Sequence, residues 1–376
     1  MASDALRILI AGGGTGGHLY PGVAVAREIL RRRPEAQIAF AGTVQGIEAR
    51  VIPREGFPLD VIRSKGIKGK SIGNRLSGAA LVPLGLVDAS RILSARKPHL
   101  VIGVGGYSSG PVVAMAWLRG IPTMLVEQNA VPGLTNRMLA PLVRAAGVTF
   151  ESTAAFFGDK AFVSGNPVRP EFLEIASSSE VAARERVSEG PPSAGAHILV
   201  FGGSQGAHAI NVAMAEAAPG LAAIRPALRV AHQTGERDAD MVRAAYQGVG
   251  LEADVQPFFF DMGRRVAEAD VIVCRAGATT IAEITAAGKP AILIPLPTAT
   301  DDHQRKNAEL LASAGAAELL LQQDMTGNEL ARRIVALAGD RAKRAQVSAA
   351  ARSLARPDAA RVIVDRALEL AGRPTC

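Results

Sequence analysis

A histidine follows a run of glycines near the start of the chain, where it could act as a general base. The run is Gly12-Gly13-Gly14-Thr15-Gly16-Gly17, and His18 comes directly after it. An apolar segment, residues 8–11, precedes the run and an amphipathic stretch, residues 19–31, follows it, which predicts strand, turn and helix. A neutral histidine at a helix start can take a proton from an attacking hydroxyl, because the helix N-terminus disfavours the imidazolium. A histidine that only caps or packs is the alternative.

The glycine run also has the spacing G-x-G-x-x-G, which alone is a weak indication of a dinucleotide site. A NAD-binding unit would carry an acid at the end of its second strand, but the sequence there is Phe40-Ala41-Gly42-Thr43. The run is therefore expected to hold another anion, such as a diphosphate, on the N–H groups of a helix start. A tight turn without a ligand is the alternative.

Two further polar loops follow buried strands in the first half of the chain. They are Gly105-Gly106-Tyr107-Ser108-Ser109-Gly110-Pro111 and Glu127-Gln128-Asn129. Ligands of open α/β sheets bind at the carboxyl edge, where the loops after parallel strands meet. We therefore expect both loops to lie beside the first glycine run.

The second half of the chain repeats the pattern of strand, glycine turn and helix. Gly202-Gly203-Ser204-Gln205-Gly206-Ala207 follows an apolar run, and the segment 275–283 follows another. In that segment Glu283 could accept two ribose hydroxyls, whereas a capping box with Thr280 is the alternative. A third polar loop, residues 295–308, carries Asp, Gln and Asn groups suited to sugar hydroxyls; N-capping by Asp301 is its alternative.

Short apolar runs alternate with helical stretches along the whole chain, which is typical of parallel sheets covered by helices. The predicted strands are residues 7–11, 37–42, 59–63, 99–104, 121–126, 145–150, 197–201, 228–232, 252–256, 270–274, 291–294 and 316–320. The fold class is α/β, with two Rossmann-like domains facing a cleft. We place the domains at residues 1–165 and 166–356, because 165–170 is rich in turn formers. The last helix, within residues 357–373, is expected to pack back on the first domain.

The bulk composition limits the kinds of site and partner. The chain has 376 residues, a net charge of +7, 4% aromatic residues and two cysteines. The charge favours an anionic partner, and the scarcity of aromatic residues disfavours nucleic acid. Two cysteines exclude a disulfide scaffold.

Asp238-Ala239-Asp240 resembles a metal-binding D-x-D motif, but it lies in a charged helical stretch and is expected to be solvated. We predict no metal site and no tightly bound cofactor, although a divalent cation could stimulate activity.

A basic run precedes an uncharged segment in the first half. Five cations without an intervening acid are followed by the apolar stretch 76–87; the cations are Arg63, Lys65, Lys68, Lys70 and Arg75. This pattern favours binding to an anionic membrane surface. A flexible basic loop beside an ordinary core helix is the alternative.

Taken in order, these motifs are similar to those of the MurG family, the UDP-N-acetylglucosamine–N-acetylmuramyl-(pentapeptide) pyrophosphoryl-undecaprenol N-acetylglucosamine transferases. The resemblance covers nearly the whole chain and rests on residues 12–18, 105–111, 127–136, 165–169, 202–207, 277–283 and the loop ending at Asn307-Ala308. The family often has a histidine before Glu127, where this chain has Val126.

The resemblance implies a two-domain GT-B glycosyltransferase at the cytoplasmic face of the inner membrane. It implies inverting transfer of N-acetylglucosamine from UDP-GlcNAc to the muramyl 4-hydroxyl of lipid I, giving lipid II. Matched by position, the donor site would comprise Thr15, Gly16, Gly17, Asn129, Arg169, Ser204, Phe259, Ala278, Thr279, Thr280, Ile281, Ala282, Glu283 and Gln304.

Inversion requires one in-line displacement and a base, for which His18 is our first choice and Glu127 the second. We expect the acceptor diphosphate to be held by Gly13, Gly14, Gly105, Gly106, Tyr107 and Ser108. A UDP-GlcNAc epimerase of the same fold and a non-catalytic nucleotide-sugar-binding protein are the alternatives.

Overall fold

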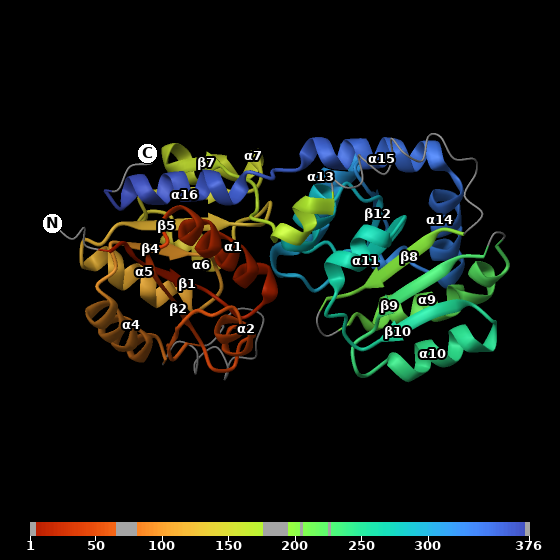
Figure 1. Cartoon of the computed structure of the whole chain (residues 1–376), viewed down its shortest axis with the longest axis horizontal. Helices are drawn as coiled ribbons and strands as arrows, with labels where there is room; N and C mark the ends of the chain where they lie inside the picture. Colours follow the sequence, from red (N-terminus) through yellow and green to blue (C-terminus); the bar gives the residue numbers. More distant parts are fainter. Residues whose placement is uncertain (1–4, 65–80, 176–194, 204–205, 225–226, 373–376) are drawn as a thin grey trace. The chain divides into compact units, whose positions relative to one another are not determined.

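Parallel strands and helices alternate along the chain and form two separate sheets. The computed structural model describes residues 5–64, 81–175, 195–203, 206–224 and 227–372 (Figure 1). The strand orders are β3-β2-β1-β4-β5-β6-β7 and β10-β9-β8-β11-β12-β13, and the paired strands run parallel. The order reverses at β1 in one sheet and at β8 in the other, which is the doubly wound pattern. The predicted class, two Rossmann-like α/β units, is confirmed.

The first sheet is built from apolar runs that are buried on both faces. Its strands are β1 Arg7–Ala11, β2 Gln37–Gly42, β3 Leu59–Val61, β4 Leu100–Gly103, β5 Thr123–Glu127, β6 Ala145–Val148 and β7 Ala161–Val163. Its helices are α1 Gly16–Arg32, α2 Glu48–Arg54, α4 Val82–Arg96, α5 Ser109–Leu118, α6 Leu134–Leu139 and α7 Glu151–Phe157. Ile10 is paired with Phe40 on one side and Ile102 on the other, so β1 lies in the centre of the sheet.

The second sheet has the same plan. Its strands are β8 His197–Phe201, β9 Arg229–Gln233, β10 Glu252–Gln256, β11 Val271–Cys274, β12 Ala291–Leu293 and β13 Glu318–Leu319. Its helices are α9 His208–Ala222, α10 Ala239–Gly248, α11 Met262–Glu268, α12 Ala278–Ala286, α13 His303–Ser313, α14 Gly327–Gly339 and α15 Arg341–Leu354. Helix α16 Ala359–Leu370 follows them in the chain but does not cover this sheet.

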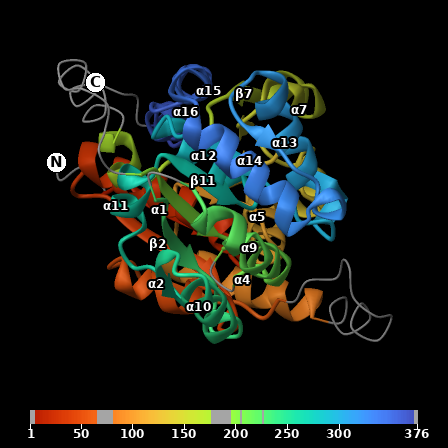
Figure 2. The ribbon, with the colours of Figure 1, turned by 90° about the vertical axis from the view of Figure 1, so that its right-hand side faces the viewer.

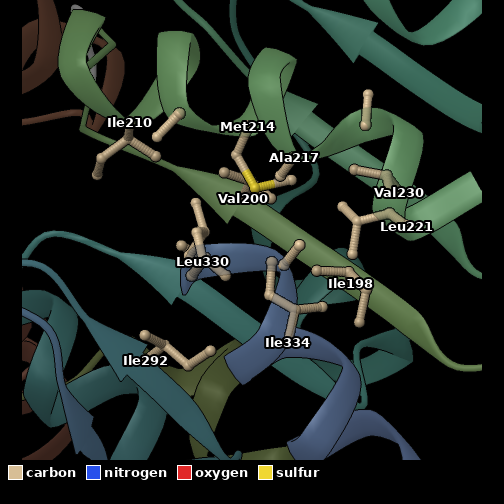
Figure 3. Packing of buried hydrophobic residues seen from close by; sticks show 14 of the residues in the cluster. Ile198, Val200, Ile210, Met214, Ala217, Leu221, Val230, Ile292, Leu330 and Ile334 are labelled. Atoms are coloured by element: carbon tan, nitrogen blue, oxygen red, sulfur yellow. The ribbon is translucent and has the colours of Figure 1, made fainter. Parts of the chain in front are cut away.

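Apolar side chains from β8, α9 and α14 form the core on one face of the second sheet. Met214 of α9 lies over Val200, and Ile334 of α14 lies beside Ile198 (Figure 3). Helix α14 packs along α9, as Figure 2 shows. Each of these side chains is fully buried or nearly so, so this core fixes the helix that follows the second glycine turn.

The chain divides into two compact units, Met1–Arg169 with Arg356–Cys376, and Pro170–Ala355. The sequence-based boundary at 165–166 lies slightly before this division. Helix α16 therefore belongs to the N-terminal unit, where it packs on α1 (Figure 1). Ile363 and Leu368 belong to the apolar core of that unit. The carboxylate Oδ1 of Asp365 forms an ion pair with Nη1 of Arg32 at 2.6 Å.

Two local predictions were wrong. Helix α1 begins at Gly16 and not at Leu19, so His18 lies in its first turn. The elements α7 and β7 were not predicted from residues 151–163. Helix α7 has seven residues and β7 has three, so both are too short for an apolar pattern to identify them in the sequence.

Candidate functional site

The first glycine run connects β1 to α1 and brings His18 beside the second glycine loop. Thr15 is the N-cap of α1, but its hydroxyl caps no backbone N–H and lies 3.2 Å from Nδ1 of His18. A Cβ at Gly105 would lie 2.7 Å from Cδ2 and 3.1 Å from Nε2 of this imidazole, so the ring rests directly on Gly105. The predicted neighbourhood of these two loops is therefore present in the structure.

The two glycine loops also touch through their backbones. A Cβ at Gly106 would overlap the Gly13 carbonyl, and a Cβ at Gly14 would lie 3.2 Å from the Tyr107 ring. Both Gly106 (φ +80°) and Gly14 (φ +88°) have left-handed backbones, which favour glycine. Larger residues would separate the loops, so the glycines are needed here for close approach as well as for the turns.

One residue of the first turn does not have the role that we expected. The Gly14 N–H donates to Oε2 of Glu48 at 2.8 Å, and Glu48 is fully buried. This amide therefore holds a carboxylate of the protein itself, and we withdraw Gly14 from the expected diphosphate donors. Thr43 binds the other oxygen of Glu48 through its N–H at 2.9 Å and its hydroxyl at 2.8 Å. Residues Thr15, Gly16 and Gly17 lie at the start of α1.

The second glycine loop leads into α5, a ten-residue helix. Ser108 is its N-cap and is fully buried, and its Oγ has no hydrogen-bond partner among the described residues. A buried hydroxyl normally has a partner, so one at a helix start indicates a polar ligand or water. Gly105, Gly106 and Ser108 are therefore the better-placed group for a diphosphate.

Glu127 ends β5 and fixes the loop that follows it. Its Oε1 accepts hydrogen bonds from the Asn129 N–H at 3.0 Å and the Asn129 side chain at 3.3 Å. Its Oε2 accepts from the Gly133 N–H at 2.9 Å and the Asn136 side chain at 2.8 Å. Burial raises the pKa of Glu127, against the lowering effect of these donors. The side chain is 1% exposed, so its geometry is that of a loop anchor.

Arg169 lies at the end of the N-terminal unit and is close to the first glycine turn. Its guanidinium carbon is 5.0 Å from the centroid of the Tyr20 ring in α1. A Cβ at Gly16 would lie 3.1 Å from that same ring, so Tyr20 connects Arg169 to the turn. This arrangement places a fixed positive charge near Thr15 and Gly16.

In the C-terminal unit a buried glutamine forms hydrogen bonds to two loops that contain predicted donor residues, the second glycine turn and the loop with Phe259. Gln233 ends β9 and is 2% exposed. Its Nε2 donates to the Gly203 carbonyl at 2.9 Å, and its Oε1 accepts from the Phe259 N–H at 2.9 Å. Phe259 is itself buried, with the Arg265 guanidinium over its ring at 3.6 Å. Ser204 lies outside the described residues.

Helix α12 supplies the largest group of predicted donor residues. It begins at Ala278 with Gly277 as N-cap and no side-chain cap, so the capping box of Thr280 and Glu283 is not formed. The side chains of Ala278, Ile281 and Glu283 are buried, whereas those of Thr279, Thr280 and Ala282 are partly exposed. At the helix start the partly exposed side chains are therefore those of Thr279 and Thr280.

The loop with Gln304 is held beside the start of α12. Arg275 donates to the carbonyls of Ile294 and Pro295 at 3.1 and 3.0 Å, and Asn307 donates to the Ala276 carbonyl at 3.3 Å. Burial lowers the pKa of Arg275 to about 10. Gln304 accepts a hydrogen bond from the Leu296 N–H at 3.0 Å. The donor residues predicted from two separate segments are thus neighbours at one sheet edge.

The expectation that the Asp238-Ala239-Asp240 motif is solvated is confirmed for Asp240, whose side chain is 98% exposed, but was wrong for Asp238. Asp238 is 6% exposed, and its carboxylate lies 3.0 Å from Nδ1 of His208 and accepts from Asn211 at 2.8 Å. Burial raises its pKa, but the hydrogen bonds from Asn211 and His208 outweigh that effect and the net shift is downward. The Oδ1 of Asn211 lies 3.1 Å from Nε2 of His232, and Nδ1 of His232 lies 2.8 Å from the Tyr246 hydroxyl. This polar network supports the start of α9 behind the second glycine turn.

The residues that anchor the loops escaped sequence reasoning. Glu48, Gln233 and Arg275 each bind backbone groups of a loop that contains predicted site residues. Only Arg275 belongs to a motif that the sequence singles out, the segment 275–283, and its role as an anchor was not predicted. Within the described ranges, no group of three or more His, Cys, Asp or Glu side chains is placed to hold a metal ion.

Exposed apolar side chains occur on α4 and at the end of α5. Five are more than 40% exposed: Val82, Leu84, Val87, Trp117 and Leu118. Arg119 donates to Ser94 at 2.9 Å, so the end of α5 lies against α4. In the basic run, Arg63 forms an ion pair with Asp88 at 2.7 Å, and the other cations lie outside the described residues. Among the helices of the described segments, none has the length and apolarity to cross a bilayer.

Comparisons with known proteins agree with this division of the chain. Residues 8–148 match the glycosyltransferase family 28 N-terminal domain, and residues 197–363 match the glycosyltransferase family 28 C-terminal domain. A relative from Anaeromyxobacter sp. (strain Fw109-5) is 47% identical over 370 residues, which cover 98% of this chain and 94% of the relative. A relative from Geobacter sulfurreducens is 47% identical over 361 residues, covering 96% and 97%. Both are named UDP-N-acetylglucosamine–N-acetylmuramyl-(pentapeptide) pyrophosphoryl-undecaprenol N-acetylglucosamine transferase.

Two solved structures resemble the chain over nearly its whole length, one at 30% and one at 16% sequence identity. The crystal structure of Acinetobacter baumannii MurG is 30% identical with a TM-score of 0.77, and the match covers 97% of this chain and 99% of that one. A UDP-N-acetylglucosamine 2-epimerase matches with a TM-score of 0.64 at 16% identity, covering 98% and 97%. At that identity the epimerase shares the fold alone.

Proposed function

Since the chain belongs to glycosyltransferase family 28, and within it to the MurG transferases, we propose that it carries out their reaction. It transfers N-acetylglucosamine from UDP-GlcNAc to the muramyl 4-hydroxyl of lipid I and so makes lipid II, a peptidoglycan precursor. The single observation that carries this proposal is the 47% identity to a named transferase over 98% of the chain. An epimerase of the same fold is disfavoured because the likeness there extends only to the fold.

His18 is the general base in this proposal. When its Nδ1 carries the proton and donates to the Thr15 hydroxyl, Nε2 holds the lone pair that a base needs. The ring lies on Gly105, beside the loop to which we assign the acceptor diphosphate. Glu127, the second choice, is less suitable because its two oxygens already accept four hydrogen bonds in a buried setting.

We assign the acceptor diphosphate to Gly105, Gly106 and Ser108 at the start of α5. The positive end of a helix and a buried hydroxyl suit phosphate oxygens. Tyr107 borders this loop and packs on Gly14, so it limits how the acceptor enters. Gly13 supports this loop, because its carbonyl lies against Gly106.

The C-terminal unit binds the donor in this proposal. The start of α12 stabilises the departing UDP diphosphate, Glu283 takes the ribose hydroxyls, and the Phe259 backbone contacts the uracil. The N–H of Phe259 already donates to Gln233, so its carbonyl is the group that we assign to the base. Arg169 and Asn129 of the N-terminal unit are also donor contacts in this proposal, on the strength of the family resemblance alone. No metal is obligatory, so turnover is expected to persist in a chelator, with at most stimulation by added divalent cations.

We also propose that the protein binds the cytoplasmic face of the inner membrane peripherally. The exposed apolar residues of α4 and α5 would contact lipid, and the basic run would contact anionic headgroups. Reversing the charge of Lys68 and Lys70 should then release the protein from anionic vesicles but not alter its weak binding to neutral ones. Equal binding of the variant and the wild type to anionic vesicles would contradict this assignment.

The reaction itself is tested by incubation with UDP-GlcNAc and a lipid I analogue. Stoichiometric UDP release should require both substrates, whereas conversion of UDP-GlcNAc without an acceptor would support an epimerase. His18→Ala should lower turnover by roughly 10²–10⁴-fold, the usual contribution of general base catalysis. UDP-GlcNAc binding, measured by calorimetry, should change much less. Equal losses in turnover and binding would remove His18 as the base.

A further inference from the structure

A single buried carboxylate joins the first glycine turn to the end of the neighbouring strand. Glu48 begins α2 and is fully buried. Its Oε2 accepts the Gly14 N–H at 2.8 Å, while its Oε1 accepts the N–H and hydroxyl of Thr43 at 2.9 and 2.8 Å. The carboxylate thus connects the loop after β1 with the loop after β2.

Three glycines make room for this side chain. A Cβ at Gly13, Gly42 or Gly46 would lie closer than 3 Å to atoms of the Glu48 side chain. Gly13 belongs to the glycine turn, whereas Gly42 ends β2 and Gly46 lies in the bend between β2 and α2. The glycine at position 13 is therefore explained by an internal side chain that must approach its backbone.

The position of Glu48 determines what the glycine turn can do. The turn gives an amide to an acid of the protein, and the negative charge of that acid lies behind it. A second anion, such as a diphosphate, would be repelled at this point. The turn is better suited to hold Thr15, the next residue after Gly14, which lies 3.2 Å from His18.

We propose that Glu48 is a positioning residue for the transfer reaction. It fixes Gly14, which sets Thr15 at the N-cap of α1, and Thr15 orients the His18 imidazole. It also holds the turn against the second glycine loop, because Gly13 and Gly14 contact Gly106 and Tyr107. This inference rests on the proposed function, in which His18 is the base.

Glutamine at position 48 is the informative change. Every group that contacts the Glu48 carboxylate donates a hydrogen bond, so an amide NH₂ must face a donor in either orientation. With the oxygen on Thr43, two hydrogen bonds remain and the one to Gly14 is lost; in the opposite orientation the NH₂ donates to the Thr43 hydroxyl and the Thr43 N–H loses its acceptor. In both orientations one backbone N–H loses its acceptor, so Glu48→Gln should leave the unit folded and weaken the connection between the two loops.

The experiment compares Glu48→Gln, His18→Ala and the double variant with the wild type. The matched control is Glu55→Gln, which changes an acid at the other end of α2 that pairs with Arg27 outside the site. We expect Glu48→Gln to lower turnover at least tenfold, while UDP-GlcNAc affinity stays within about twofold. The double variant should be no slower than His18→Ala, because Glu48 acts through His18. Glu55→Gln should match the wild type.

A structural readout keeps the test independent of activity. The imidazole resonance of His18, assigned by its loss in His18→Ala, should shift or broaden in Glu48→Gln and not in Glu55→Gln. An unchanged resonance, unchanged turnover, or losses that multiply in the double variant would each overturn the positioning role. Wild-type protein that fails to join the two substrates would instead contradict the proposed function, and the resonance would still decide the role of Glu48.

Discussion

Replacing Glu127 by glutamine tests whether this acid anchors a loop or accepts a proton. The carboxylate binds four N–H donors, two on each oxygen, from Asn129, Gly133 and Asn136. Glutamine has the same shape, but one oxygen becomes an NH₂ group. In either orientation the NH₂ faces two donors, so the loop between Asn129 and Asn136 loses part of its support.

The size of the effect follows from those contacts. A buried donor left without an acceptor costs about 1–3 kcal/mol, so two would cost about 2–6 kcal/mol. One of them is recoverable, because the Oδ1 of Asn136 is buried and has no hydrogen-bond partner among the described residues. Rotation of the Asn136 amide would turn this oxygen toward the new NH₂, in exchange for the longer hydrogen bond of 3.3 Å from Asn136 to the Val126 carbonyl. The remaining cost is about 1–3 kcal/mol. If it falls wholly on the site, it lowers the equilibrium constant for donor binding by roughly 5- to 150-fold.

The assay separates this loss into binding and turnover. In Glu127→Gln the loss should fall mainly on UDP-GlcNAc affinity, measured by calorimetry, since Asn129 is assigned to the donor. Combined with Asn129→Ala it should add less than about twofold, because both changes disable one contact. Glu151→Gln, an exposed acid of the same unit, is the control. A fall in turnover beyond roughly 10²-fold at saturating donor, with unchanged affinity and independent of Asn129, would identify Glu127 as the base and refute the argument.

Two further predictions concern the C-terminal unit. Gln233→Leu removes both hydrogen bonds that link Gly203 to Phe259 and should weaken UDP binding at least tenfold in calorimetry, because the buried Phe259 N–H left without an acceptor alone costs about 1–3 kcal/mol; a change below twofold would contradict the link. Burial lowers the pKa of His232 from 6.5 to about 3, so this group is neutral in the folded unit and gains a proton on unfolding in acid. Its contribution to stability is complete above pH ~6.5 and is lost as the pH falls toward ~3, by about 2 kcal/mol at pH ~5. Denaturant unfolding of the wild type should therefore depend more steeply on pH than that of His232→Gln, and parallel curves would contradict this assignment.

The sequence predicted the central strands well because each is a continuous apolar run between polar turns. The ranges predicted for β1, β2 and β8 coincide with the observed strands. The range predicted for β10 also coincides, although β10 is an edge strand in which only Val255 is buried. Buried parallel strands have this pattern wherever both faces of the sheet are covered. The edge element β7 lacks it, since only three residues pair and they remain partly exposed, so it could not be recognised.

The sequence located the loops of the candidate site but not the residues that hold them. Glycine turns and polar clusters are local patterns, so they can be found one segment at a time. The bond between Gly14 and Glu48 joins residues 34 positions apart and exists only because β1 and β2 are neighbours in the sheet. Asp238 illustrates the same limit, because its burial depends on α9 packing against α10.

The position of Glu48 explains how a G-x-G-x-x-G spacing can occur without a dinucleotide. In a NAD-binding unit the acid ends the second strand and hydrogen-bonds a ribose hydroxyl of the cofactor. Here the second strand ends at Gly42 and the acid comes five residues after Thr43, at the start of a helix. From there its carboxylate points back into the fold and binds the glycine turn itself. At this place in the fold the acid is therefore not available to a cofactor, because it supports the residues beside His18 from within the protein.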